Sequence, residues 1–359
     1  MTMEHRFGGS RPFSVGVEEE LLLVDAETLR LAPVAAPVLE AMASPDAAAS
    51  HEVYAAGIEL RSDPSDTVTQ ACREVASLRS SARRAGATLI GAGVHPAGEF
   101  GDAALVETER YREVEKSMRG LVRRTPECAL HVHVGLPDED AAIRVFNGVR
   151  RHLPLLVALS ANSPLWFGRD SGFASSRFFL VRSFPRRAVP RAFRDFDDYA
   201  STIDRTIEAG ELGDYTFIWW DARLHARLGT IELREMDAQS RIDDVAALAA
   251  LVQALCLHEH EAGRADWPPP EAISESSFRA ARDGIDATIL HDGALRPVGE
   301  IARVVVAAVA PHARTLGCER ELEGIERIVS EGGGAGRQRA AFSKGGLEVL
   351  LRQLAQEAV

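Results

Sequence analysis

The chain has 359 residues, of which 46% are hydrophobic, and it carries a formal net charge of −12 at pH 7. This length allows one large or two ordinary domains with a substantial core. The acidic balance disfavours a nucleic-acid partner and an anionic membrane surface.

The sequence shows no signal for export or membrane insertion. Its N-terminus lacks the apolar stretch of a signal peptide. The most apolar segments, 245–257 and 301–310, are too short to cross a bilayer. Four cysteines without disulfide or metal-site spacing are typical of the reducing cytosol: Cys72, Cys128, Cys256 and Cys318. We therefore expect a cytoplasmic protein with no membrane partner.

The segment 15–25 predicts a β-strand with two carboxylates on one face. Side chains alternate along a strand, so Glu18 and Glu20 share a face while Val17 and Leu21 share the other. Buried carboxylates are costly unless they are paired or coordinated, and hard divalent cations are their usual partners. An edge strand with a solvated acidic face is the alternative. Glu19 falls on the apolar face, where the sequence gives it no role.

Three later segments repeat this pattern of a polar and an apolar face. The strand predicted at 53–61 presents Glu59 and follows Glu52, and the strand at 129–135 presents His131 and His133. These histidines could be metal ligands, polar groups of a site or satisfied structural residues. The strand predicted at 229–237 places Ile231 and Leu233 on its apolar face. Its polar face carries Thr230, Glu232, Arg234 and Met236. A further strand, at 216–223, is expected to carry Phe217, Trp219, Asp221 and Arg223 on one face.

Helical periodicity accounts for most of the remaining chain. Helices are predicted at 67–85, 109–124, from Asp138 or Asp140 to 153, and at 197–209, 243–258, 279–290, 298–316, 319–329 and 347–355. A short strand is expected at 88–94, and the glycine-rich stretch 332–336 is interpreted as a flexible turn. Strands followed by a helical C-terminal part indicate an α+β protein.

The segment 160–194 is strongly basic within an acidic chain. It holds seven arginines and one acid, Asp170: Arg169, Arg177, Arg182, Arg186, Arg187, Arg191 and Arg194. Guanidinium groups match the geometry of carboxylates and phosphates, which favours an anion-binding role for some of them. We expect Arg177 to contact an anionic substrate group and Arg186, Arg187, Arg191 and Arg194 to be peripheral. The alternative is a solvated loop or a subunit contact.

Together the four strands indicate a sheet with helices on its back and an ionic site on its front. Several carboxylates near an arginine-rich segment suit Mg²⁺ ions that bridge carboxylates and nucleotide phosphates. Mg²⁺ prefers oxygen ligands, which agrees with glutamates rather than cysteines at these positions.

Five segments resemble, in the same order, motifs of the carboxylate–amine ligase family, the second type of glutamate–cysteine ligase. They are Gly-Val-Glu-Glu-Glu at 16–20, His-Val-His-Val-Gly at 131–135, Ser-Ala-Asn-Ser-Pro at 160–164, Phe-Ala-Ser-Ser-Arg at 173–177 and Gly-Thr-Ile-Glu-Leu-Arg-Glu-Met-Asp at 229–237. The resemblance covers 13 to at least 257. It implies an antiparallel sheet curled into a funnel, flanked by helices and related to the glutamine synthetase catalytic fold.

The resemblance implies a single catalytic domain over 1–359, with a sheet-based core at 13–257 and a mainly helical packing region at 258–359. It also implies ATP-dependent amide formation through an acyl phosphate, with glutamate and cysteine as the default small-molecule substrates. The implied cofactors are ATP and two or more Mg²⁺ ions, and a homodimer is the implied assembly.

Site roles carry over from the resemblance position by position. The acidic metal ligands are Glu18, Glu20, Glu59 and Glu232, and Glu52 stands where relatives often have another acid. Three residues match catalytic positions: Arg234, which faces phosphate, with Glu232 and His133. Three arginines are assigned to the nucleotide or substrate anion: Arg234, Arg177 and Arg223, the last within a Trp-Asp-Ala-Arg segment at 220–223.

Two other functions fit parts of the pattern. A metal-dependent hydrolase could use His131 and His133 with nearby carboxylates to hold zinc. A second histidine-rich stretch, 258–261, lies at the polar end of a predicted helix, where we expect it to be solvated. A non-catalytic nucleotide-binding relative is the other alternative.

Overall fold

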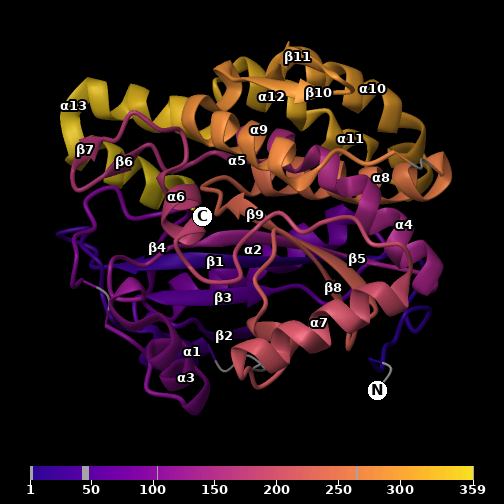
Figure 1. Ribbon diagram of the computed structural model, residues 1–359. Helices are drawn as coiled ribbons and strands as arrows, with labels where there is room; N and C mark the ends of the chain where they lie inside the picture. The colour runs from indigo at the N-terminus through magenta and orange to yellow at the C-terminus, as the bar shows by residue number, and fades with distance from the viewer. Residues whose placement is uncertain (1–2, 43–47, 103, 264–265, 359) are drawn as a thin grey trace.

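The computed structural model describes residues 3–42, 48–102, 104–263 and 266–358. Its centre is a seven-stranded sheet in the order β2-β3-β1-β5-β9-β8, with β4 paired to β1 (Figure 1). The strands are β1 (Val15–Val24), β2 (Ala49–His51), β3 (Gly57–Arg61), β4 (Thr88–Ile90), β5 (Ala129–Gly135), β8 (Ala222–His225) and β9 (Thr230–Asp237). Every pairing in this sheet is antiparallel, as predicted.

Helices cover the apolar back of the sheet and fill the C-terminal part of the chain. The N-terminal helices are α1 (Ala35–Met42), α2 (Val68–Arg84), α3 (Glu109–Met118), α4 (Glu139–Val149), α5 (Leu153–Ser160), α6 (Ser176–Arg182) and α7 (Phe196–Gly210). The C-terminal helices are α8 (Ile242–Ala262), α9 (Pro270–Asp283), α10 (Val298–Leu316), α11 (Glu319–Leu322), α12 (Gly324–Ser330) and α13 (Gly333–Glu357). In Figure 1 the helices from α8 onward gather on one side of the sheet.

Short 3₁₀ turns and two hairpins connect these elements. The turns are η1 (Arg119–Leu121), η2 (Arg150–His152), η3 (Tyr215–Phe217) and η4 (Gly284–Asp286). The hairpins pair β6 (Leu165–Trp166) with β7 (Arg169–Asp170) and β10 (Thr288–His291) with β11 (Ala294–Pro297).

One large apolar cluster joins the back of the sheet to the helices. It contains Val17, Leu130 and Leu233 from the strands, and it continues through α8 to Ile273 and Val298 of the C-terminal part. Because these side chains are essentially removed from water, their burial supplies the main driving force for packing the two parts together. The charged face of the sheet is not part of this cluster and is available to form a functional site.

Several predicted elements end elsewhere than the sequence indicated. The strand at 216–223 is wrong: Asp214 caps the 3₁₀ turn η3 by accepting a hydrogen bond from the Thr216 amide at 2.7 Å, and β8 begins only at Ala222. The strand at 53–61 is shorter and begins at Gly57. The polar helix at 109–124 stops at Met118, because Arg119 adopts a positive φ of 53°.

Two corrections concern the C-terminal part. The helix predicted at 279–290 is wrong, because α9 ends at Asp283 and a hairpin follows. Asp292 and Gly293 both have positive φ, which is the geometry of a two-residue hairpin turn, and the Asp-Gly pair was the signal for it. The stretch 332–336 is not a flexible turn, since Gly332 is the N-cap of α13 and the helix begins at Gly333. Gly334 packs so closely on Asn162 that a Cβ there would lie 2.3 Å from the Asn162 side chain.

Candidate active site

The charged strand faces line one cavity of about 540 Å³. Neighbouring strands place Glu20 opposite Glu59, Glu18 opposite His131, and His133 opposite Glu232. The predicted site residues that line the cavity are Glu18, Glu20, Glu59, His131, His133, Arg177, Arg223, Glu232 and Arg234. The structure therefore brings together every site residue predicted from the sequence, and Glu52, which follows the family pattern of a further acid, lines the same cavity.

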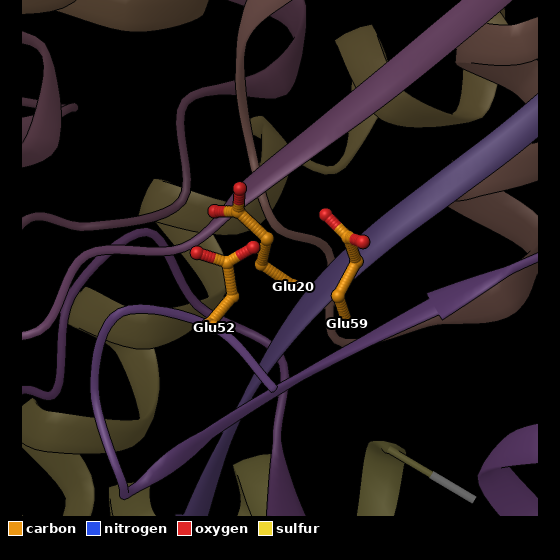
Figure 2. Close-up of side chains that lie close together, drawn as sticks. All are labelled: Glu20, Glu52 and Glu59. Carbon is orange, nitrogen blue, oxygen red and sulfur yellow. The ribbon is translucent and has the colours of Figure 1, made fainter. Parts of the chain in front are cut away.

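Three of the carboxylates that line the cavity lie close together (Figure 2). Glu20, Glu52 and Glu59 each offer an oxygen, and these oxygens lie within 4.8 Å of one another. Burial together with the neighbouring acids, opposed in part by a hydrogen bond from the Val53 amide, raises the pKa of Glu52 to about 7. Burial and the charge of Glu52 also raise the pKa of Glu20. A divalent cation would relieve this crowding of negative charge.

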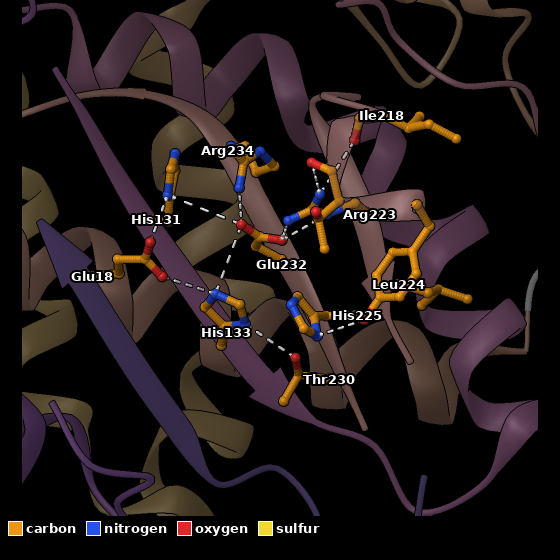
Figure 3. Close-up of polar contacts among 12 residues, drawn as sticks. Glu18, His131, His133, Ile218, Arg223, Leu224, His225, Thr230, Glu232 and Arg234 are labelled. Atoms are coloured by element: carbon orange, nitrogen blue, oxygen red, sulfur yellow. Dashed lines mark hydrogen bonds and ion pairs between the residues drawn. The ribbon is translucent and has the colours of Figure 1, made fainter. Parts of the chain in front are cut away.

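A second group forms around Glu18 and Glu232 (Figure 3). His133 Nε2 lies 3.4 Å from Glu18 Oε2 and 3.7 Å from Glu232 Oε1. His131 Nδ1 lies 3.6 Å from Glu18 Oε1. Burial alone would raise the pKa of Glu18, yet its contacts with the two histidines hold that pKa well below the usual range. Burial lowers the pKa of His131 to about 4, so its ring is neutral near pH 7.

Two arginines fix Glu232 from opposite sides (Figure 3). Arg223 donates to Glu232 Oε2 from Nε at 2.9 Å and from Nη2 at 2.7 Å, and its Nη1 donates to the Thr216 carbonyl at 3.0 Å. Arg234 forms an ion pair with the other oxygen, Oε1. Although burial opposes it, the two guanidinium charges lower the pKa of Glu232. Arg223 thus orients Glu232, and its predicted contact with a nucleotide stays a prediction.

A β-bulge in β9 changes which face Met236 occupies. Leu130 pairs with Met236 and Val132 pairs with Leu233, so the single residue His131 faces both Arg234 and Glu235. The extra residue reverses the alternation beyond it, and Met236 is fully buried in the apolar cluster. The prediction that Met236 shares the polar face of Glu232 and Arg234 is therefore wrong.

A model of glutamate–cysteine ligase family 2 matches residues 14–353. The chain belongs to this family. Two proteins of Rubrobacter xylanophilus, provisionally named glutamate–cysteine ligase 2-1 and 2-3, are each 38% identical to it. The first alignment covers 96% of this chain and 94% of the relative, and the second covers 99% of both.

Solved structures show the same fold at low sequence identity. A glutamate–cysteine ligase of Francisella tularensis in complex with AMP superposes with a TM-score of 0.73 and 12% identity, over 96% of this chain and 88% of that one. A bifunctional glutathione synthetase of Pasteurella multocida gives a TM-score of 0.71 and 16% identity, over 96% of this chain and 52% of that one.

Membership of glutamate–cysteine ligase family 2 makes the chain an ATP-dependent ligase. It decides against the metal-dependent hydrolase and the non-catalytic relative. Both histidines of the hydrolase hypothesis line the same cavity as Arg234 and the carboxylates. The prediction of a solvated stretch at 258–261 is wrong at Glu259, which is only 1% exposed. Among the described residues, no helix is long and apolar enough to cross a membrane.

The arginine-rich segment of this ligase contributes two residues to the cavity. Arg177, as predicted, lines it, and a buried ion pair joins its Nε to Glu127 Oε2 at 3.1 Å. Arg187 also lines the cavity and donates from Nη2 to the Arg234 carbonyl at 2.8 Å, so its peripheral placement is wrong. Arg186 instead donates to the Phe217 carbonyl and stacks on Trp219.

The remaining family motifs form a hydrogen-bond network next to Arg177. Asp237 accepts hydrogen bonds from the Asn162 amide at 2.9 Å, from Ser163 Oγ at 2.7 Å and from Ser175 Oγ at 2.9 Å. The Arg177 amide donates to Ser163 Oγ at 3.2 Å. The motifs at 160–164 and 173–177 therefore act by positioning an arginine.

The sequence interpretation missed one wall of the cavity. Part of the cavity lining is apolar and consists of Val114, Met118, Val122, Val181, Phe184 and Trp219. Val114 and Met118 lie four residues apart on α3, which is the spacing of one helix face. This spacing was the available signal, but the polar composition of 109–124 obscured it. His225, at the end of β8, and Arg227, in the β8–β9 connection, were also missed.

Proposed function

We propose that the enzyme joins a substrate carboxylate to an amine as an amide, with glutamate and cysteine as the default pair. The supporting observation is that Glu18, Glu20, Glu59 and Glu232 meet Arg234 in one cavity. None of the four cysteines is among the described residues that line this cavity. The arrangement supplies charge neutralisation and positioning, which is what phosphoryl transfer requires.

In the proposed reaction the substrate carboxylate oxygen attacks the γ-phosphorus of ATP. The bond from that phosphorus to the β,γ-bridging oxygen breaks, and ADP leaves. The amine nitrogen then attacks the acyl carbon of the resulting acyl phosphate and loses a proton, and inorganic phosphate leaves with the original carboxylate oxygen. Atoms balance without a covalent enzyme intermediate.

The acidic residues fit Mg²⁺ by chemistry and placement. Glu20, Glu52 and Glu59 form a set of converging oxygens. Glu18 and Glu232 both lie near His133 Nε2, and Glu232 is paired with two arginines, so the binding of two or more ions stays a prediction. The crowding that raises the pKa of Glu20 and Glu52 is an electrostatic cost that bound cations offset. When bound, Mg²⁺ would supply positive charge against the triphosphate.

The enzyme's own residues then hold the reacting groups. Arg234, kept in place by Glu232, provides a cation beside the transferring phosphoryl group. His133 donates or accepts a hydrogen bond with Thr230 Oγ1 at 3.0 Å and keeps Nε2 toward Glu18 and Glu232. Arg177 is proposed to contact the anionic substrate. The funnel-like curl of the sheet and a homodimer, both implied by the resemblance, stay predictions.

Isotope labelling tests the mechanism. The substrate carboxylate is labelled with heavy oxygen, and the products formed with Mg²⁺–ATP and the amine are analysed by mass spectrometry. We expect one labelled oxygen in inorganic phosphate. Label in AMP, with pyrophosphate as coproduct, would establish adenylation and refute the acyl phosphate while leaving ligation intact.

A phosphate-release screen tests the substrate pair. Acidic carboxylates and amines are combined with Mg²⁺–ATP, and we expect release to require both partners and to be fastest with glutamate and cysteine. Faster release with another pair would replace the default substrates. Release with none of the pairs would contradict the ligase activity proposed for this cavity.

A further inference from the structure

The chain makes a tight turn shortly after α6, over the residues Phe-Pro-Arg-Arg at 184–187. The Arg187 amide donates to the Phe184 carbonyl at 3.4 Å. Proline stands at the second position of the turn, and Arg186 at the third has a φ of 65°. This is the pattern of a type II turn, whose third position normally takes glycine or asparagine. The backbone of Arg186 is therefore held in a conformation that costs free energy.

Contacts of the Arg186 side chain offset this cost. Its Nε donates to the Phe217 carbonyl at 2.9 Å, and its guanidinium carbon lies 4.9 Å from the centre of the Trp219 ring. The residues at the two ends of the turn, Phe184 and Arg187, both line the active-site cavity. Strained backbone that its surroundings hold in place is typical of functional sites. The turn therefore calls for a role of the residues that it presents to the cavity.

Arg187 has one nitrogen left for a ligand. Its Nη2 donates to the Arg234 carbonyl at 2.8 Å. Its Nε lies 3.7 Å from Asp221 Oδ1 and is closed off from solvent. Its Nη1 has no hydrogen-bond partner among the described residues and, unlike Nε, is not closed off. Since the side chain keeps 6% of its exposure and lines the cavity, Nη1 is the atom that a ligand in the cavity can reach.

Two other arginines of the cavity also keep one terminal nitrogen. Arg177 Nη1 donates to the Glu235 carbonyl at 3.2 Å, and its Nε lies 3.1 Å from Glu127 Oε2. Arg234 Nη1 forms the ion pair with Glu232. In both arginines Nε is closed off from solvent, whereas Nη2 is not and has no partner among the described residues. Three guanidinium groups therefore each leave one N–H group available in one cavity.

The charges of these groups act on Arg187. Burial and, after it, the charge of Arg177 lower the pKa of Arg187 to about 10, and Arg234 adds to this effect. Asp221 and Glu127 oppose it. Arg187 is still charged near pH 7, so an anion bound among the three arginines would relieve their mutual repulsion.

The acids near Arg187 differ from those near Arg234. Although burial opposes it, the carboxylates of the proposed Mg²⁺ ligands Glu232, Glu18 and Glu20 raise the pKa of Arg234. The two acids that act on Arg187 are not proposed metal ligands. Arg234 thus belongs with the carboxylates proposed for Mg²⁺ and phosphate, whereas Arg187 suits an anionic group that no metal ion neutralises.

We propose that Arg187 is a further specificity-determining residue of the ligase reaction, whose Nη1 donates to a substrate carboxylate that does not react. The inference rests on the proposed function. The default substrates offer two such groups, the α-carboxylate of glutamate and the carboxylate of cysteine, and both have the chemistry that a guanidinium recognises. A charge-assisted hydrogen bond of this kind is stronger than a neutral one, so a substrate without the carboxylate is disfavoured.

Decarboxylated analogues test the proposal. 4-Aminobutyrate is glutamate without its α-carboxylate, and cysteamine is cysteine without its carboxylate. Phosphate release with Mg²⁺–ATP gives two ratios of kcat/KM, glutamate over 4-aminobutyrate and cysteine over cysteamine. We expect Arg187→Met to lower at least one ratio by about tenfold or more, because the variant has lost the group that distinguishes substrate from analogue. The ratio that falls identifies the carboxylate. Two ratios equal to those of the parent would overturn the proposal.

Two further variants control for folding. Arg194→Met changes an arginine of the same basic segment that is 79% exposed in its pair with Asp195, and both ratios should match the parent. Arg187→Met leaves Asp221 paired with Arg182, which favours a folded variant. If it nevertheless fails to fold, Arg187→Lys keeps the charge but lacks the planar fork, so it should still lower the ratio several-fold. Parental ratios in a folded Arg187→Lys variant would then refute the contact.

The parent enzyme separates this inference from the proposed function. Absence of phosphate release by the parent with every pair contradicts the proposed function, whereas release by the parent with unchanged ratios in Arg187→Met removes only the role of Arg187. If another pair proves faster, the decarboxylated analogues of that pair are used.

Calorimetric titration measures the contact without turnover. The parent and Arg187→Met are titrated with glutamate in the presence of Mg²⁺ and a non-hydrolysable ATP analogue. If the glutamate ratio falls, glutamate should bind Arg187→Met about tenfold more weakly than the parent. If only the cysteine ratio falls, the affinity for glutamate should be unchanged. A fallen glutamate ratio with unchanged affinity would show that Arg187 acts on the chemical step and would overturn the proposed contact.

Discussion

Glu20, Glu52 and Glu59 place three carboxylates within reach of a single cation. Replacing any one with glutamine removes an anionic ligand with little change in volume. We expect Glu20→Gln, Glu52→Gln and Glu59→Gln each to lower turnover by more than about 100-fold and to raise the Mg²⁺ concentration needed for half-maximal rate. Steady-state kinetics across Mg²⁺ concentrations measure both effects.

The control for these variants is Glu208→Gln, on the exposed face of α7, which should match the parent enzyme. Circular dichroism should show that all the variants are folded. Near-normal turnover in two of the three cavity variants would show that the metal lies elsewhere, with Glu18 and Glu232 the next positions to test.

Glu235 gives a prediction about pH. It is 4% exposed, and burial, together with the charge of Asp221, raises its pKa to about 8 from an ordinary value of 4.5. The folded state therefore holds this proton more tightly than the unfolded state. Its contribution to stability is complete below about pH 4.5 and is lost as pH rises to about 8.

Glutamine at position 235 does not titrate. The difference in unfolding free energy between Glu235→Gln and the parent should therefore shift in favour of the variant as pH rises from 5 to about 8. Urea unfolding at several pH values measures this difference. A difference that is constant over that range would show that Glu235 is already ionised in the folded state.

At the scale of the structural elements, Glu19, to which the sequence gave no role, joins β1 to α2. Glu19 accepts from Arg79 Nε at 2.9 Å and Nη2 at 2.6 Å, and both side chains are almost completely buried. Arg79 also donates to the carbonyls of Gln239 and Ser240, which tie the end of β9 to the same point. Glu19 thus holds the strand that presents Glu18 and Glu20.

Removing one partner of a buried ion pair leaves an uncompensated charge. We expect Glu19→Gln to lower the unfolding free energy by about 3 kcal/mol. In a double-mutant cycle with Arg79→Met, the coupling should exceed about 1 kcal/mol, whereas distant sites would add independently. Urea unfolding of the four proteins supplies the cycle. Additive effects would show that each residue acts through separate contacts.

The bulge in β9 leads to a separate prediction at Met236. Met236→Ala should lower the unfolding free energy by about 2 to 5 kcal/mol, because it opens a cavity in the core. Leu295→Ala, at a position 60% exposed on β11, is the control and should change it by less than about 0.5 kcal/mol. A large loss of turnover with unchanged stability would instead place Met236 on the cavity side.

The sequence predicted the sheet through alternation, which is why Glu18, Glu20, His131 and Glu232 were assigned to one site. Alternation is a local property, and it fails where the partner strand decides the register, as at the bulge before Met236. It also cannot reveal long-range pairs such as Glu19 with Arg79, which lie 60 residues apart. The apolar part of the cavity lining was missed for another reason, since the polar composition of 109–124 obscured the spacing of Val114 and Met118 on α3.

At the scale of the whole molecule, the sheet and the C-terminal helices share one apolar core. The cluster that contains Val17 and Leu233 continues to Val298 and Ile325 without a break. Gln338 of α13 also donates to the Asn162 carbonyl at 2.7 Å, within a motif that positions Arg177. The region 258–359 therefore supports the site indirectly, which favours the prediction of a single domain.

Shared burial predicts that both regions unfold together. Four tryptophans can report this: Trp166, Trp219, Trp220 and Trp267. One variant keeps only Trp219, in the active-site cavity, and another keeps only Trp267, between α8 and α9. We expect the fluorescence midpoint of each in urea to coincide with the circular dichroism midpoint of the same variant. If the Trp267 signal changes at lower urea than circular dichroism does, the helical region is a separate unit that the sheet does not need. Coincident transitions are expected because the cluster that contains Val298 and Ile325 also contains residues of the sheet. If either the sheet or the helices unfolded alone, the apolar face of the other would be exposed to water, which is unfavourable.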